Sequence, residues 1–482
     1  MLLRQTLLYL PAQLLGPLAQ FVAVIAWTHF LSPTGYGNFT LVTATQDFAY
    51  LVGMGWFTFY ALRYYGDVTD PDEQARFRNT ETVALAAGSV VQAVVGIGLL
   101  VFVVDIPLTP FVIAAVVIYM VTRMINTHFA ERSRAVQAIG AYSVLQTVGP
   151  VAGLLLGLAA TTMFQASAAV ALAGYAVAQV AAIGLVAPLI GIGLKPQRME
   201  RGLVVRAMGY GLPLLVSGLF DWVGLNGIRF IVEWQMGAEG VGLLGVGWGL
   251  GQRGAAVAAM LVTAAAFPLA LAHARKGGHK DGLAQLSRNG ALLVAMLAPA
   301  VAGLHAISIP LVTLLVDPAF HDATMTILPL AVVAGALRNL RLHFADQTFL
   351  ISERPGLVAF VDGAEAVVAV VSAWIGLQYG GLIGAAMGAA IGTALSATIS
   401  FLIATLKFGL VIPWGAFVRI GIATLLMWLA LHAVPEPQTI LGLIGEVLLG
   451  AVIYGLALAA FYPRIVADFL RDRLARRAIA GE

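Results

Sequence analysis

Long apolar segments recur from one end of this 482-residue chain to the other, separated by short polar loops. Each is close to the roughly 20 residues that an α-helix needs to cross about 30 Å of hydrocarbon. Inside a bilayer every backbone polar group must be satisfied within the protein, so such segments fold as helices. Because 60% of the residues are hydrophobic and only 11% are charged, a soluble globular domain is excluded. The sequence therefore predicts an all-α polytopic membrane protein.

The apolar pattern predicts about 14 transmembrane helices, and the loop charges support that number. If the N-terminus is cytoplasmic, the loops expected inside collect basic residues such as Arg132 and Arg134, whereas outer loops such as 317–323 contain no Lys or Arg. We therefore expect a multi-pass protein with both termini in the cytoplasm. The predicted spans are 6–30, 38–62, 80–104, 108–130, 138–160, 166–192, 207–232, 241–272, 286–316, 324–346, 357–378, 382–406, 415–433 and 439–462.

Composition also limits the classes of function. The chain has no cysteine, which excludes disulfides, thiolate chemistry and Cys-ligated metal sites. The basic residues behind its net charge of +3 are explained by membrane orientation and by proximity to anionic lipid headgroups. We therefore expect membrane lipids as partners and no nucleic acid. No Gly-Lys-Ser or Gly-Lys-Thr phosphate cradle occurs, which argues against ATP hydrolysis within the chain. The outer loops are short, which disfavours a membrane-embedded glycosyltransferase or polymerase, and we predict no enzymatic activity.

The two halves of the chain carry matching motifs. Loop SPTGYGNFT after the first span parallels GAEGVGLLG after the seventh, with Gly35 and Gly240 at an offset of 205 residues. RMINTHFAE, residues 123–131, likewise parallels RNLRLHFAD, residues 338–346. Because transporter folds are often built from duplicated halves, we predict two pseudo-symmetric six-helix lobes followed by two additional helices. The predicted regions are an N-terminal lobe (1–194), a cytoplasmic linker (195–206), a C-terminal lobe (207–407), two further helices (408–462) and a basic cytoplasmic tail (463–482).

Several motifs resemble the multidrug/oligosaccharidyl-lipid/polysaccharide (MOP) exporter superfamily, and within it the Wzx-type polysaccharide flippases. They are LLYLPAQLLGPLAQF in the first span, HFLSPTGYGNFTLV at 29–42, LLVDPAFHDATMTILPLAVVAGALRNL at 314–340 and GGLIGAAMGAAIGTAL at 380–395. The resemblance covers essentially the whole chain. These motifs are signatures of the scaffold and carry little information about the substrate.

The resemblance implies two lobes around a central cavity that opens alternately to either side of a bacterial inner membrane. The implied cargo is an undecaprenyl-pyrophosphate-linked oligosaccharide repeat unit for O-antigen or exopolysaccharide synthesis, with a polysaccharide polymerase and a chain-length regulator as implied partners. Two alternatives stay open at this point. One is a lipid II flippase, and the other is an ion-coupled multidrug or metabolite exporter.

Intramembrane arginines are the candidate substrate-binding residues. Ionisable groups in hydrocarbon cost several kcal/mol or more, so they persist mainly where they face a cavity, a partner or a water path. Guanidinium groups match phosphate geometry with paired donors, which suits a pyrophosphate. Because the repeat relates Arg123 to Arg338, we expect Arg123, Arg338 and Arg341 to line one cavity. The alternatives are snorkelling to headgroups or a structural lock with carboxylates. The candidates are Arg123, Arg229, Arg253, Arg338 and Arg341.

Four carboxylates are candidates for ion coupling or gating. Asp47 lies near the middle of the second span, where a carboxylate either binds a coupling H+ or Na+ or neutralises an arginine. Asp221 lies two turns from Arg229 and is a possible partner for it. Glu131 and Asp346 correspond in the repeat and are expected at the cytoplasmic rim. We predict no catalytic residue, no metal site and no cofactor.

Three further polar groups lie within predicted spans. His128 and His343 recur at equivalent positions of the repeat, which favours a shared structural role at least as strongly as proton coupling. Glu365 is a single carboxylate in the eleventh span, and such groups are more often structural than functional. These residues are therefore weaker candidates than the arginines.

Overall fold

A computed structural model describes residues 2–104, 106–191 and 199–463, and this part of the chain contains helices and no strand. Ten of its helices are long and apolar enough to cross a membrane. Two of these, α8 (Arg201–Gly277) and α13 (Gly356–Leu406), each contain two helices. With α1 (Leu2–Thr28) and the continuous helix over 33–64, the described residues form fourteen spans, which confirms the predicted fold class.

The N-terminal lobe contains the first six spans, and short polar motifs set where several of its helices begin. Ser32, Asp70 and Thr109 each precede a proline and accept a hydrogen bond from a backbone N–H in the first turn. Proline fits this first turn because its missing N–H would have no partner there. The elements are α1, α2 (Pro33–Tyr50), a π-helical turn η1 (Leu51–Gly55), α3 (Trp56–Tyr64), a 3₁₀ turn η2 (Tyr65–Asp67), α4 (Pro71–Phe102), α5 (Pro110–Ala135), α6 (Ile139–Met163) and α7 (Ala168–Ile190).

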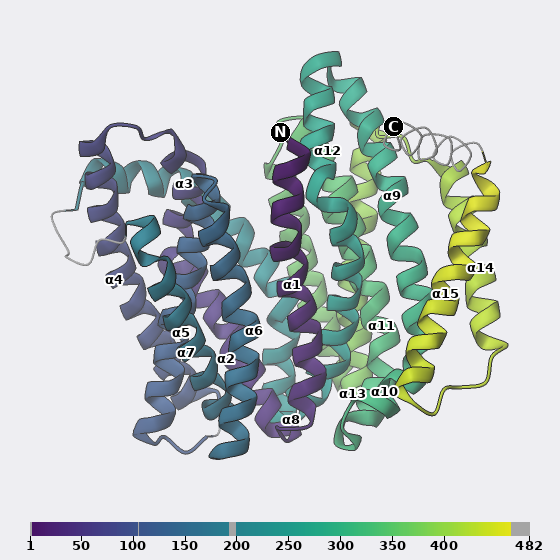
Figure 1. Ribbon diagram of the computed structural model, residues 1–482, viewed down its shortest axis with the longest axis horizontal. Helices are drawn as coiled ribbons and strands as arrows, with labels where there is room; N and C mark the ends of the chain where they lie inside the picture. Colours follow the sequence, from purple (N-terminus) through teal and green to yellow (C-terminus); the bar gives the residue numbers. More distant parts are fainter. Residues whose placement is uncertain (1, 105, 192–198, 464–482) are drawn as a thin grey trace, which may run out of the picture.

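The C-terminal lobe contains the next six spans, and the last two helices lie beside it. Figure 1 shows α4–α7 on one side of the molecule, α9–α13 on the other, and α14 and α15 at the outer edge of the second group. Helix α1 begins and α15 ends at the same end of the molecule. The elements are α8, α9 (His279–Ala306), α10 (Ser308–Leu315), η3 (Pro318–Phe320), α11 (His321–Leu340), a π-helical turn η4 (Arg341–Ala345), α12 (Asp346–Ile351), α13, α14 (Trp414–His432) and α15 (Ile440–Phe461).

Two glycines reverse the chain direction without a loop. Gly237 within α8 has φ 68° and Gly381 within α13 has φ 58°, values in the left-handed region that favours glycine. Each therefore separates two spans that run in opposite directions. The repeat motif GAEGVGLLG begins at the first of these reversals.

A symmetric contact joins the two lobes, and we call its four residues Pro33, Gly37, Ala238 and Gly242 the glycine crossing. A Cβ on Gly37 would overlap the Ala238 carbonyl and lie 3.0 Å from the Gly242 amide nitrogen. A Cβ on Gly242 would overlap the Pro33 carbonyl and lie 3.0 Å from the Gly37 amide nitrogen. Both pairs of equivalent residues differ by 205 positions, the offset of the sequence repeat. Such reciprocity is what a two-fold axis produces, so the lobes are pseudo-symmetric.

Some predicted features lie outside the described residues. The tail is described only to residue 463 and the linker only from residue 199. In the described part of the linker, Glu200 pairs with Arg76 of α4 at 3.7 Å and with Arg206 of α8 at 3.5 Å. The domain limits drawn from the sequence stay a prediction.

Candidate substrate cavity

A cavity of about 310 Å³ lies between the lobes. It is lined by α1, α2, α5, α6 and α7 of the N-terminal lobe and by both halves of α8. Thr40 and Gly245, and likewise Ala44 and Gly249, are equivalent in the repeat, and all four line the cavity. The cavity therefore straddles the pseudo-two-fold axis. The cavity begins one helical turn from the glycine crossing. We call this end of the cavity the far end, and the glycine crossing holds the two lobes together there.

Four of the predicted site residues meet in this cavity. They are Arg123 of α5, Asp47 of α2, and Arg229 and Arg253 of α8. Arg123 Nε donates to Gln46 Oε1 at 2.9 Å, and its Nη2 lies 3.7 Å from Asp47 Oδ1. The charge of Arg123 is therefore balanced from within its own lobe.

Arg229 and Arg253 have neutral partners only. Arg229 Nη1 donates to Asn226 Oδ1 one turn away, and Arg253 Nη1 donates to the Gln20 carbonyl of α1 at 3.0 Å. Neither forms an ion pair with any residue that the structure describes. Two guanidinium groups without a carboxylate partner inside a membrane protein are costly, and an anionic ligand would offset that cost. The cavity thus has three cationic groups and one carboxylate.

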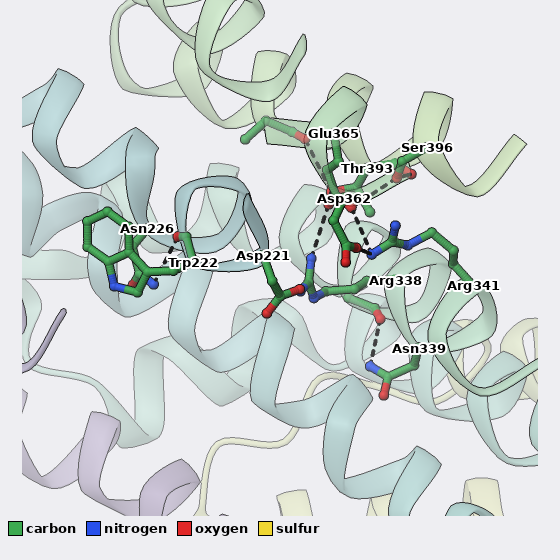
Figure 2. A network of polar contacts seen from close by, with 12 residues as sticks. Asp221, Trp222, Asn226, Arg338, Asn339, Arg341, Asp362, Glu365, Thr393 and Ser396 are labelled. Carbon is green, nitrogen blue, oxygen red and sulfur yellow. Dashed lines mark hydrogen bonds and ion pairs between the residues drawn. The ribbon is translucent and has the colours of Figure 1, made fainter. Parts of the chain in front are cut away.

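Arg338 and Arg341 do not line this cavity. They belong to a mostly buried group within the C-terminal lobe, which we call the C-lobe cluster: Asp221, Arg338, Arg341, Asp346, Asp362 and Glu365. Figure 2 shows both arginines converging on Glu365, to which they lie at 3.1 and 3.3 Å. Arg338 also pairs with Asp221 of α8. The expectation that Arg123, Arg338 and Arg341 share one cavity is therefore not met, and the predicted alternative, a lock with carboxylates, describes the last two.

The rest of the C-lobe cluster is closely hydrogen-bonded. Arg341, fully buried, pairs with Asp362 at 2.7 Å and lies 3.7 Å from Asp346. Hydroxyl groups of α13 add hydrogen bonds, because Thr393 and Ser396 donate to Glu365 at 3.0 Å and Ser400 donates to Asp346. Arg341 Nε and Nη1 and Asp346 Oδ2 are buried without a hydrogen bond to any described residue. Four carboxylates face two guanidinium groups, so the cluster carries two surplus negative charges if every group is ionised.

Neighbouring helices explain why the equivalent residues Arg338 and Arg123 have different partners. Arg338 finds Asp221 on the first half of α8 and Glu365 on α13. In the N-terminal lobe the corresponding helices are α1 and α6, and their sequences contain no Asp or Glu. Arg123 therefore lacks counterparts of Asp221 and Glu365, and it pairs instead with Asp47 of α2 at the central cavity.

The N-terminal lobe has a buried lock of its own at Glu81 of α4. Glu81 accepts from His128 Nε2 at 2.7 Å and pairs with Arg132, while Thr58 lies 2.8 Å from His128 Nδ1. Glu131 does not take part, because it pairs with Arg134 at 3.3 Å on the same helix, outside the cavity. His128 is thus held in a buried hydrogen-bonded lock with Glu81 and Thr58.

A sequence profile of polysaccharide biosynthesis proteins matches residues 2–271, more than half of the chain. This chain belongs to the polysaccharide biosynthesis protein family. None of the curated proteins compared with it matches.

Solved structures similar to this family member are membrane transporters. The lipid II flippase MurJ in an inward closed conformation has a TM-score of 0.67 at 12% identity, covering 96% of this chain and 100% of its own. A mutant of the Vibrio cholerae MATE transporter VcmN has a TM-score of 0.58 at 16% identity, covering 84% and 96%. An inward-facing MATE family transporter of the MOP superfamily has a TM-score of 0.56 at 14% identity, covering 84% and 98%. These likenesses confirm the fold that the resemblance to the MOP superfamily implies.

Sequence reasoning about this polysaccharide biosynthesis family member missed three important residues. It does not single out Asp362, places Arg132 in a cytoplasmic loop and makes Glu365 a weaker candidate, yet all three are buried ion-pair partners. One signal for Asp362 and Glu365 is that these acidic residues occur in the predicted span that follows the span with Arg338 and Arg341, since buried arginines need carboxylate partners. Which arginine each acid meets depends on helix packing.

Proposed function

We propose that this protein is a flippase that carries a polyprenyl-pyrophosphate-linked oligosaccharide across the bacterial inner membrane, with both termini in the cytoplasm. Membership of the polysaccharide biosynthesis family and the transporter fold support this role. The observation that carries the proposal is the pair Arg229 and Arg253, which line the cavity between the lobes without a carboxylate partner. A polysaccharide polymerase and a chain-length regulator stay proposed partners.

The cavity's charge suits a pyrophosphate. Its three guanidinium groups and one carboxylate leave two positive charges, and guanidinium groups bind phosphate oxygens with paired donors. The polar head would travel in the cavity while the polyprenyl tail stays in the bilayer. Translocation requires no bond to be made or broken, so the proposed role is transport and not catalysis. The two lobes would rock against each other to expose the cavity to either side, and the glycine crossing would form when the far end is closed.

The C-lobe cluster supports a second element of the proposal, coupling to an ion gradient. Its two surplus negative charges would attract a proton or Na+, and Asp221, at 37% side-chain exposure, is its most accessible carboxylate. Because α8 carries Asp221 at one position and Arg229 two turns further on, binding of a cation there would act on the same helix that lines the cavity. Asp47 is the other candidate for this role, through its pair with Arg123.

A lipid II flippase is the second candidate, because the structure named as the lipid II flippase MurJ matches this fold along its full length. Both cargoes carry a pyrophosphate, so the arginines suit either one. An exporter of amphipathic cations is disfavoured by the positive charge of the cavity. Deletion of the gene distinguishes the first two, according to whether a lipid-linked oligosaccharide or lipid II accumulates.

Charge substitutions in a deletion strain test the proposal directly. We expect Arg229→Gln and Arg253→Gln to abolish surface polysaccharide at normal protein abundance, with the Lys variants partly active. Arg134→Gln is the matched control, because Arg134 pairs with Glu131 outside the cavity and is half-exposed. Full export by the Arg229→Gln/Arg253→Gln double variant would refute the assignment.

A further inference from the structure

The N-terminal wall of the cavity differs in chemistry from the α8 wall. Helices α6 and α7 line it with Gln146, Tyr175 and Gln179 among small or apolar residues, and they contribute no charged group. Helix α5 adds Tyr119 and Asn126. We call these five residues the neutral wall. The one charged pair on this side, Arg123 and Asp47, is internally balanced, so the uncompensated charge lies on α8 opposite.

Aromatic rings form one part of this wall and hold one another in place. The ring centroid of Tyr175 lies 5.8 Å from Phe39, 6.2 Å from Trp27 and 6.4 Å from Tyr119. A Cβ on Gly153 of α6 would overlap the nearest atom of the Tyr175 ring, so glycine at that position lets the ring pack closely against α6. Rings fixed in this way present an apolar surface at little cost in side-chain entropy.

The other part of the wall has unused hydrogen-bonding groups. Asn126 Nδ2 donates to the Leu145 carbonyl at 3.0 Å, whereas its Oδ1 is buried without a partner. Gln179 Oε1 accepts from Thr122 at 2.7 Å, which leaves its amide nitrogen free to donate. The Gln146 amide and the Tyr119 hydroxyl line the cavity with no hydrogen bond to any described residue. Neutral donors and acceptors therefore surround an apolar surface, and buried polar groups need partners.

We propose that the neutral wall binds the sugar attached directly to the pyrophosphate and selects a neutral pyranose at that position. A pyranose has apolar C–H faces and a rim of hydroxyl groups, which match the rings and the amides. The pyrophosphate would lie against Arg229 and Arg253 on α8. A uronic acid carboxylate at the neutral wall would be buried without a free cation beside it, which is unfavourable. This inference rests on the proposed function.

The size of the cavity restricts recognition to that first sugar. A volume of about 310 Å³ is at the lower end of the range of roughly 300–1,000 Å³ for small-molecule sites. It accommodates a pyrophosphate and one ring but not a whole oligosaccharide. We therefore expect selectivity for the proximal sugar and tolerance of the sugars beyond it.

Binding of short-chain lipid diphosphates to the purified full-length protein tests the inference. The probes are farnesyl diphosphate alone and the same lipid diphosphate carrying glucose, galactose, N-acetylglucosamine or glucuronic acid. We expect at least one neutral sugar to tighten binding about tenfold over the bare lipid, and glucuronic acid to add nothing. Tyr175→Leu and Gln146→Leu should each remove the gain while leaving the bare lipid's affinity unchanged. Tyr175→Phe, which keeps the ring, should retain most of it.

The outcomes separate this inference from the proposed function. If the bare lipid binds but every sugar probe binds equally well, the neutral wall is not a sugar subsite and the flippase proposal stands. If Tyr175→Leu and Gln146→Leu weaken bare and sugar-bearing probes alike, these residues act on the fold, and the inference is again refuted. If no probe binds the unmodified protein, the pyrophosphate proposal itself fails.

Discussion

The glycine crossing should control access to the cavity from the far end. A Cβ at Gly37 or Gly242 would lie 2.7 Å from the carbonyl carbon of Ala238 or Pro33, respectively. Carbon atoms in contact prefer about 3.5–4.0 Å, so each added methyl group requires the helices to retreat by about 1 Å. Both obstacles are backbone atoms, which no change of rotamer can move. Substitution by alanine therefore penalises the state in which the far end is closed.

Overpacking of this kind costs about 1–3 kcal/mol for each site. A penalty on the closed state alone would raise the ratio of open to closed molecules about 5- to 150-fold, at tenfold for each 1.4 kcal/mol. The double variant Gly37→Ala/Gly242→Ala should exceed either single variant, because the two contacts are equivalent. Gly35→Ala is the matched control, since its Cβ would meet only ordinary contacts, the nearest at 3.4 Å from Ser32 Oγ.

The absence of cysteine from the chain makes the assay direct. Thr43→Cys places a single thiol in the cavity wall. In sealed vesicles, a membrane-impermeant maleimide applied on the far-end side should label this thiol faster in the Gly37→Ala and Gly242→Ala backgrounds than in the Gly35→Ala background. Equal labelling rates in all three would show that the crossing does not hold the far end closed.

Three further predictions concern buried and exposed charges. Arg341→Met leaves Asp346 and Asp362 buried without a cation, so thermal unfolding should show a loss of about 3–5 kcal/mol. Unchanged stability would mean that the C-lobe cluster is not a lock. Glu81→Gln should be similarly destabilising, because it removes the negative charge that pairs with Arg132. The control Glu131→Gln should change the free energy of unfolding by less than about 0.5 kcal/mol. Equal losses in the two variants would contradict the burial argument. Glu200→Gln should cost less than about 1 kcal/mol in the same measurement, since its ion pairs are exposed, and a larger loss would indicate that it anchors the linker.

The positions of the spans and the duplication were predictable from the sequence. The length of an apolar segment and helix-starting motifs such as Ser32-Pro33 depend only on neighbouring residues. They can therefore be recognised without knowing how the helices pack. The repeat was also visible, because Gly37 and Gly242 must both stay small to let the lobes cross. Such packing constraints leave small residues at matching positions of the two halves, so they can be seen in the sequence.

The roles of the intramembrane charges were decided by the tertiary structure. The sequence marks Arg123, Arg229 and Arg253 as charged groups within the membrane, and the structure brings them to one cavity. It treated Arg338 as their equivalent, whereas packing gives it Asp221 and Glu365. Apolar span length is a property of consecutive residues, but charge compensation depends on which helices meet and which way their side chains point. For that reason a duplicated fourteen-helix membrane protein can be predicted from the sequence, whereas only the packing of the helices shows that Arg229 and Arg253 lack a carboxylate partner among the described residues.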